Sequence, residues 1–492
     1  MTGGDMAVNN NTMSTEPRSV RSVWSRIKAQ FSQVPLLGWL LGALVAAILE
    51  QLVGTPLARV LGMSKMPSLF GGVLIFQPLG VLADYLTDFF AWAWGQAEIL
   101  PPFPVETMLQ ELALIPPAIL YVLLVYILPI AGVARLTDKL TNRLAARLLS
   151  FNMLVSVLVH LGLLYATLHI WALGPESVAY RGLVSRLALI AVMVTLSLNV
   201  VNGYMGEFSC SHPGFMALGA YIASVFTVVF FVQDNTFGAP LLPEALGPFM
   251  FPIGLILAGV VSAVGALLVA VPSFRTRGDY LAIISLAFMF IVKSMFENLE
   301  VVGGARGLSG QPDWASLPVV FIWTVLCIWT INNFVRSTMG KALNAVRDGE
   351  LAADAMTVDT RRTKMLAFLF AAFWAGLAGG LFAHVLRYVN PDTFGLKKLA
   401  EVLAMVYLGG LNSVVGSIVG ATGYSLLSEA LRPLELWKWI IIPVLLILLM
   451  VFRPTGMIAF REFDVRKLLE PKGKPGGPDA EPARPAQVTS QE

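Results

Sequence analysis

The polar side chains that could do chemistry in this 492-residue chain form three groups, although 56% of the residues are hydrophobic. Asparagines, a glutamate and a histidine occur in LNVVNGYMGEFSCSHPGFMALGAY, a lysine and a glutamate in KSMFEN, and nine charges in GKALNAVRDGELAADAMTVDTRRTK. Polar groups in such apolar surroundings are typical of transport pathways and of contacts with partner proteins. No group has the spacing of a catalytic triad, a carboxylate pair or a metal site, so the sequence does not indicate an enzyme.

The first group interrupts an apolar run with four glycines between Gly203 and Gly219. Non-helical backbone inside a membrane is stable only where protein or a water-filled cavity satisfies it, and broken helices of this kind form transport sites. A turn between two spanning helices, with glycines that allow close packing, would give the same pattern. If the segment forms a transport site, its candidate pathway residues are Asn199, Asn202, Glu207, Ser209 and His212.

The second group is expected near the outer end of a membrane helix. Lys293 and Glu297 are four residues apart, so they share one helix face and can form an ion pair. A pair of this kind suits a snorkelling helix end as well as a contact with substrate. We therefore include Lys293, Glu297 and Asn298 as candidate pathway residues.

The third group extends from Gly340 to Lys364, between two apolar runs. Moving its nine charges into hydrocarbon would cost about 20 kcal/mol, so the segment must lie outside the bilayer. Its alanines, leucines and methionines nevertheless favour helix. A structured, charged segment between membrane helices is either a solvated loop or a docking site for a cytoplasmic partner.

Gly349 divides this charged segment into two expected helices, 337–348 and 350–356. The short second helix has the dimensions of an element that fits a groove on a partner. Asp359 or Thr360 can cap the spanning helix that follows.

Composition and hydropathy predict an all-α polytopic membrane protein. Charged residues make up 13% of the chain and mean hydropathy is +0.72, whereas soluble domains carry about 25% charged residues. Many apolar runs reach the roughly 17–25 residues that a spanning helix needs. We expect about 10–12 transmembrane helices, some short or broken, near 35–53, 112–134, 150–173, 186–204, 214–232, 250–272, 280–298, 317–335, 366–388, 398–412, 413–430 and 437–452.

Basic residues cluster in alternate gaps between these runs. The positive-inside bias places these gaps, and with them both termini, in the cytoplasm. Arg181 and Arg186 are exceptions, because they fall on the expected outer side. The basic gaps are 135–147, 275–277, 336–364 and 453–467.

The same charge pattern constrains two ambiguous stretches. Residues 69–94 contain Asp84 and Asp88, one helical turn apart, and a single crossing here would move the next basic loop outside. We therefore expect an amphipathic or re-entrant segment on the outer surface. The glycine-rich stretch 398–430 must cross an even number of times, which favours two short or broken helices.

The remaining reactive residue types are isolated. Cys210 and Cys327 lie in apolar surroundings and form no zinc or disulfide pattern. His160, His169 and His384 are single histidines in apolar runs, which are more typical of packed core positions than of ligands. The small net charge of +3 indicates no nucleic-acid partner.

The segments GYMGEFSCSHPGFMALGAY, RGDYLAIISLAF, GGARGLSGQP and GKALNAVRDGELAADAMTVDTRRTKMLAF follow one another in the chain. Together they resemble the branched-chain amino acid permeases of ATP-binding cassette (ABC) importers. RGDYLAI and the long N-terminal extension resemble the LivM-type subunit, and the resemblance covers about Leu196–Met457. Glu207 stands where this family has glutamine, and Thr357 stands where it has glycine.

This resemblance implies one of two different permease subunits of an importer in the bacterial inner membrane. A periplasmic binding protein would deliver branched-chain or related apolar amino acids. Two cytoplasmic ATPase subunits would use ATP and magnesium, so this chain itself would bind no cofactor. Residues 350–356 would form the coupling helix, and the coupling residues would be Arg347, Asp348, Glu350, Ala352, Ala353 and Met356.

Two alternatives stay open, because related ABC permeases carry urea or small carboxylates and broken helices suit an ion-coupled secondary transporter equally well. The expected domain map is a cytoplasmic tail at 1–33, a membrane extension at 34–185 with the outer-surface segment near 69–94, a permease domain at 186–457 with the coupling loop 336–364, and a cytoplasmic tail at 458–492, disordered from about 471.

Overall fold

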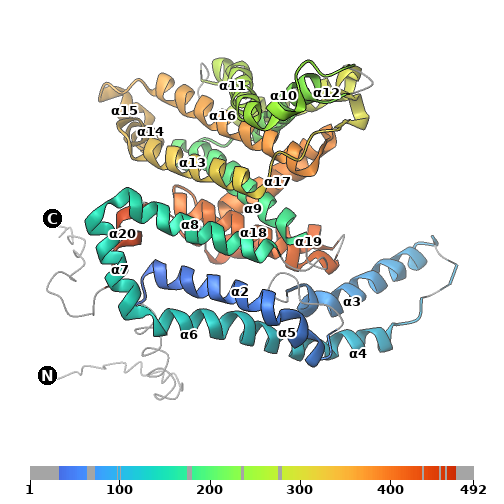
Figure 1. The fold of residues 1–492 in the computed structure, drawn as a ribbon. Coiled ribbons are helices and arrows are strands. Elements are labelled where there is room, and N and C mark those ends of the chain that lie inside the picture. The colour runs from blue at the N-terminus through green and yellow to red at the C-terminus, as the bar shows by residue number, and fades with distance from the viewer. Residues whose placement is uncertain are drawn as a thin grey trace, which may run out of the picture. The chain divides into compact units, whose positions relative to one another are not determined.

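The computed structural model in Figure 1 confirms the all-α membrane fold. It describes residues 33–63, 72–96, 98–99, 101–173, 180–233, 238–274, 280–434, 437–453, 456–459 and 463–472. Within these residues, the extended pairing is a two-residue antiparallel ribbon of β1 (Leu308–Ser309) and β2 (Tyr388–Val389). The expected tail up to residue 32, the basic pair Arg275 and Arg277, and the tail from residue 473 lie outside the described residues.

Helices form most of the described residues. They are α2 (Leu36–Val60), α3 (Gly72–Ala93), α4 (Val105–Ala113), α5 (Ile115–Val122), η2 (Leu123–Ile127), α6 (Leu128–Leu136), α7 (Asp138–Phe151), α8 (Met153–Ala172), α9 (Tyr180–Asn199), η4 (Val200–Met205), α10 (His212–Phe231), η5 (Glu244–Leu246), α11 (Gly247–Ser273), α12 (Tyr280–Asn298), η6 (Glu300–Val302), η7 (Gly304–Arg306), α13 (Leu317–Arg336), α14 (Thr338–Asp348), α15 (Glu350–Ala355), α16 (Thr360–Leu386), η8 (Pro391–Phe394), α17 (Leu396–Gly409), α18 (Val414–Ala430), η9 (Arg432–Leu434), α19 (Lys438–Phe452) and α20 (Val465–Leu469).

Nine helical stretches in the described part of the chain are long and apolar enough to cross a membrane. They are α2, the stretch from α4 to α6, α8, α9 with η4, α10, η5 with α11, α12, α13 and α16. The glycine-rich stretch forms two shorter helices, α17 and α18, as predicted. The orientation of the helices, the cytoplasmic termini and the position of α3 on the membrane stay predictions.

The chain divides into two compact units. In the smaller unit, Asn142 of α7 donates to the carbonyl oxygen of Gln33 at 3.2 Å and accepts from the backbone nitrogen of Lys472 at 3.0 Å. One side chain thus connects segments from the two ends of the sequence. This unit comprises residues 1–46, 126–164 and 465–492.

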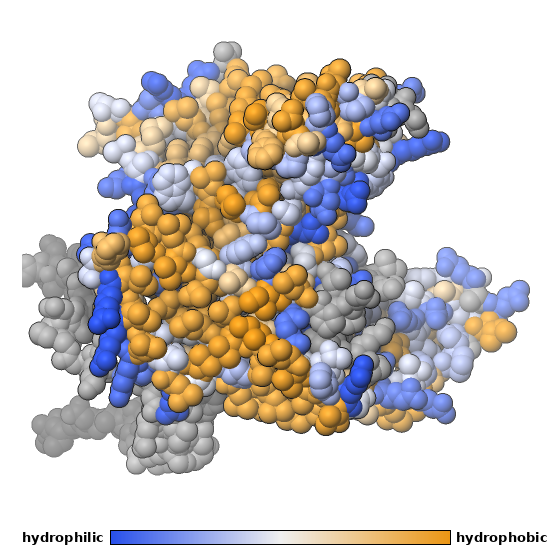
Figure 2. All heavy atoms as spheres, viewed as in Figure 1, coloured by the Kyte–Doolittle hydropathy of each residue, from blue (hydrophilic) through white to orange (hydrophobic). Residues whose placement is uncertain are grey.

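The larger unit, residues 47–125 and 165–464, is built around α16, which packs against α9, α10 and α11. Small residues let these helices approach closely. A Cβ atom on Gly219 of α10 would lie only 1.9 Å from the carbonyl oxygen of Gly376 in α16, so no side chain fits there. Figure 2 shows apolar residues gathered over α10 and α11 and hydrophilic residues toward α14 and α15.

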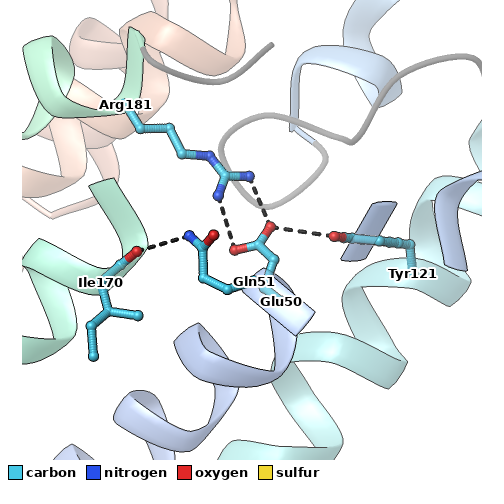
Figure 3. A network of polar contacts seen from close by, with 5 residues as sticks. All are labelled: Glu50, Gln51, Tyr121, Ile170 and Arg181. Atoms are coloured by element: carbon cyan, nitrogen blue, oxygen red, sulfur yellow. Dashed lines mark hydrogen bonds and ion pairs between the residues drawn. The ribbon is translucent and has the colours of Figure 1, made fainter. Parts of the chain in front are cut away.

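A buried ion pair joins α2 to α9 in the larger unit (Figure 3). The Arg181 guanidinium donates to both carboxylate oxygens of Glu50, at 2.9 and 2.8 Å, and both side chains are fully buried. The Tyr121 hydroxyl of α5 donates to the same carboxylate at 3.3 Å. The exception that Arg181 makes to the positive-inside pattern therefore has a physical reason, because its charge is neutralised inside the protein.

Candidate functional site

The charged segment between α13 and α16 folds into two helices, as predicted. Ser337 caps α14, because its hydroxyl accepts from the backbone nitrogen of Gly340 at 3.4 Å. The chain is extended at Gly349, which separates α14 from the six-residue helix α15. The Asp359 carboxylate accepts from the backbone nitrogen of Arg362 at 2.9 Å and caps α16.

The two helices bury different amounts of surface. On α14, Leu343 and Val346 are buried against the membrane helices. On α15, Ala353 is buried and Leu351 is 75% exposed, and Met356, directly after the helix, is 77% exposed. Exposed apolar side chains on a short, projecting helix are typical of a contact surface. Leu351 was not among the coupling residues expected from the sequence, although a leucine within a charged helix is a signal for such a surface.

Lys364 connects this contact helix to the broken-helix segment. Its ammonium lies 2.7 Å from a carboxylate oxygen of Glu207 and 2.9 Å from one of Glu350, and its side chain is only 9% exposed. The sequence placed Glu207 and Glu350 in separate groups and gave Lys364 no role. A signal existed, because a cation near the start of a helix opposes the helix dipole and needs carboxylate partners.

Arg347 makes a second connection between the same segments. Its guanidinium donates to the carbonyl oxygen of Gly203 at 3.4 Å and to Asp348 at 2.8 and 2.9 Å. A Cβ atom on Gly206 would lie 2.4 Å from Cγ of Arg347, and the backbone there has φ of +76°, so this position requires glycine. Arg347 therefore rests directly on the end of the broken helix.

The chain leaves helical form between η4 and α10, two stretches that are each long and apolar enough to span a membrane, so the loop 206–211 agrees both with a turn between spanning helices and with a broken helix. The helix α9 continues into η4, a π-helical segment, and then leaves helical form until α10. Such π segments are frequent at functional sites. Asn199 lies at the junction: its amide donates to the carbonyl of Ser413 at 3.1 Å and the hydroxyl of Ser417 at 2.7 Å, and accepts from the backbone nitrogen of Asn412 at 3.1 Å. It thus ties α9 to the turn between α17 and α18.

Three further candidate residues lie inside this loop. The Asn202 side chain accepts from the backbone nitrogen of Ser209 at 3.2 Å and closes the loop. His212 is fully buried as the first residue of α10. The backbone nitrogen of Cys210 donates to Ser285 at 2.8 Å, and burial raises the pKa of the Cys210 thiol, so the thiol stays protonated.

The second candidate group lies at the other end of α12 from Ser285. The Lys293 ammonium lies 3.4 Å from Glu297, as its spacing predicted, and 2.7 Å from Asp392, which the sequence did not indicate. Asn298 donates to the carbonyl of Ser294 on its own helix at 2.7 Å. The structure therefore separates these residues from the site around Lys364. Among the described residues, no group of three His, Cys, Asp or Glu side chains could hold a metal ion.

The comparison with known families decides the identity of the fold. Residues 181–452 match the family described as "Branched-chain amino acid transport system / permease component". The chain belongs to this permease family. No solved structure matches the permease.

The permease is similar to several curated proteins. It is 31% identical over 333 residues to the high-affinity branched-chain amino acid transport system permease protein LivM of Salmonella typhimurium, covering 59% of this chain and 74% of the relative. The LivM protein of Escherichia coli is 31% identical over 310 residues, covering 56% and 69%. A probable LivM protein of Methanocaldococcus jannaschii is 23% identical over 329 residues, covering 57% and 95%.

One departure of the permease from its family falls at the end of α15. Thr357, where the family resemblance implies glycine, has φ of +65°. The backbone nitrogen of Val358 donates to the carbonyl of Ala353 at 3.1 Å, the bond that closes a helix through a left-handed residue. The left-handed conformation costs a non-glycine residue about 1–2 kcal/mol. The permease makes this turn with a strained residue in it.

Proposed function

We propose that this chain is a transmembrane subunit of an ABC importer for branched-chain or related apolar amino acids. The family and the LivM relatives support the transport class. The observation that carries the mechanism is the connection from the exposed helix α15 through Lys364 to Glu207 beside the helix break. The domain map expected from the sequence, with its coupling loop at 336–364, is part of this proposal.

The import function requires partner subunits, and the exposed apolar side chains of α15 offer one of them a contact surface. A second permease subunit completes the pathway. A periplasmic binding protein delivers the substrate to the outer face of the inner membrane. Two ATPase subunits bind ATP and magnesium and perform the hydrolysis, so the permease itself is not an enzyme. One ATPase subunit seats α15 in a groove through Leu351 and Met356, with Ala352 beside them.

The ion pairs of Lys364 with Glu350 and Glu207 can transmit a movement of the docked helix α15. When the ATPase subunit moves α15, Glu350 moves with it, and Lys364 links Glu350 to Glu207. Glu207 follows η4 directly, and Arg347 contacts the same segment through Gly203. The movement therefore reaches the helix break, where a transporter of this kind changes access.

Reconstitution of the complete complex tests the proposal. We expect leucine uptake into proteoliposomes to require ATP, both permease subunits and the binding protein. The double change Leu351→Asp and Met356→Asp should abolish co-purification of the ATPase subunits and reduce uptake more than tenfold, because charges replace the apolar contact. The matched control is Leu241→Asp, at an exposed leucine between α10 and η5, which should change neither.

Two results would contradict the proposal. If the ATPase subunits still co-purify with the double variant, α15 is not their docking helix. If this chain alone accumulates leucine on a proton or sodium gradient, it is a secondary transporter.

A further inference from the structure

A cavity of about 250 Å³ lies in the larger unit between α9, α17 and α18. Its lining residues recur every three or four positions, which is the spacing of one helix face. Each of the three helices therefore turns a single face to the cavity. The lining positions are 180, 184, 187, 188, 190, 191 and 194 on α9, 398, 401, 402 and 405 on α17, and 424, 425, 428 and 429 on α18.

Ionisable side chains lie at two places on the wall of this cavity. The Lys398 ammonium lies 2.8 Å from a carboxylate oxygen of Glu401, and these side chains are 18% and 22% exposed. The Tyr180 hydroxyl donates to Glu429, which also pairs with Arg432 at 3.4 Å. Ionisable groups among membrane helices are costly and mark ligand pathways. The sequence alone indicated no role for these residues.

The end of the cavity farther from Tyr180 is apolar. Because Tyr180 contacts Glu429 and Asn199 contacts Ser417, α9 and α18 run antiparallel, and Glu429 lies beside the start of α9. Val194 lies about 20 Å further along α9, where Met216 and Met405 also line the cavity. Lys398 and Glu401 precede Met405 on α17 by about two turns and one turn, roughly 10 and 6 Å, so a charged pair of both signs lies next to the apolar end.

This polarity matches one class of small molecule. We propose that the cavity binds a zwitterionic amino acid with a branched aliphatic side chain, its ammonium at Glu401, its carboxylate at Lys398 and its side chain toward Met405 and Val194. The inference rests on the proposed import function and adds a site to it. The volume lies below the roughly 300–1,000 Å³ of pockets for drug-sized ligands, which suits a small substrate.

Beyond the apolar end of the cavity, hydrogen bonds of Asn199 join α9 to α18 and to the α17–α18 turn. A second cavity of about 370 Å³ lies past them and is lined by Tyr204, Asn332, Arg336 and Asn412 among others. Asn412 lines this second cavity and donates its backbone nitrogen to Asn199. Along α9 and η4, the tie between Asn199 and the α17–α18 turn lies between Val194 of the first cavity and Tyr204 of the second, in the segment that Lys364 and Arg347 connect to α15.

Cysteine protection in the complete transporter tests the site. Ala191→Cys places a thiol on the cavity wall, and the native Cys210 and Cys327 are buried, so the unmodified chain gives the background. We expect L-leucine to slow the reaction of this thiol with a small, water-soluble methanethiosulfonate at least fivefold. The matched control is Ala239→Cys, at an exposed loop alanine, whose labelling rate should not depend on leucine.

A second variant tests the charge complementarity. Glu401→Gln should raise the leucine concentration that gives half protection at least tenfold, while glycerol at the same concentrations should protect neither form. If the complex transports leucine but leucine protects nothing at Ala191→Cys, the site is wrong and the importer stands. If the unmodified complex accumulates no amino acid, the proposed function fails, and the site fails with it.

Discussion

At the scale of single residues, Lys364 shows how a buried charge can carry a mechanical connection. It lies near the start of α16, where the helix dipole disfavours a cation by about 0.3–1 kcal/mol. Two carboxylates within 3 Å, from Glu207 and Glu350, overcome this penalty. Glu207, where the sequence resemblance implies glutamine, thus has a partner that explains its charge.

Replacing Lys364 should uncouple ATP hydrolysis from transport. Lys364→Met leaves the carboxylates of Glu207 and Glu350 without their cation, at a cost of about 1–3 kcal/mol. We expect ATPase association to persist while uptake per ATP falls more than fivefold, measured together in proteoliposomes. Glu207→Gln should be milder, because Glu350 still pairs with Lys364. Arg361→Met, at an exposed position on the same helix, is the control, and an equal loss there would refute the connection.

At Thr357 we expect a substitution that stabilises the protein. Thr357→Gly should stabilise the protein by about 1 kcal/mol, because glycine adopts the observed φ of +65° without strain. Thermal unfolding of the purified complex would report it as a raised Tm. Thr338→Gly, at the start of α14, should lower the Tm because it gains only flexibility. A decrease for both variants would show that Thr357 is not strained.

At the scale of elements, the sequence predicted the starts and ends of helices, because residues at these positions determine them. Gly349 and Asp359 end and begin helices through their own backbone and side-chain chemistry, so the limits of α14, α15 and α16 were readable from the sequence. The partners of Lys364 and Asn199, and the Asp392 partner of Lys293, come from 14 to 218 positions away. Sequence spacing carries no information about such contacts, which is why Asp392 and the contact of Tyr180 with Glu429 were missed.

The packing of α10 on α16 gives a test at this scale. Gly219→Ala should destabilise the permease strongly, by about 2–5 kcal/mol, because its Cβ would lie 1.9 Å from a backbone oxygen that cannot move without shifting α16. Yield of folded complex and Tm measure the effect. Gly423→Ala on α18 is the matched control, since no atom lies within 4 Å of its Cβ position and alanine favours helix. Equal stability of the two variants would contradict this packing.

At the scale of the whole molecule, the family domain and the helices before it share a buried polar contact. The family match begins at Arg181, whose partner Glu50 lies in α2 and whose neighbour Tyr121 lies in α5. Residues Glu50 of α2 and Tyr121 of α5 therefore connect the part of the larger unit before the family match to α9 (Figure 3). The helix α9 also lines the proposed amino acid site and continues into η4. A change in this ion pair should therefore lower the stability of the whole larger unit.

Charge removal at Arg181 provides the decisive experiment. Arg181→Met leaves Glu50 fully buried without its cation, and breaking a buried pair in this way costs about 3–5 kcal/mol. We expect a lower Tm and loss of uptake. The double variant Glu50→Leu and Arg181→Met should recover most of the stability, because neither charge is left uncompensated. Arg186→Met breaks the more exposed pair with Asp313, at 3.2 Å, and should cost at most about 1 kcal/mol. If the double variant is no more stable than Arg181→Met alone, the loss comes from arginine packing against Trp171, whose ring lies 4.9 Å away, and not from the charge of Glu50.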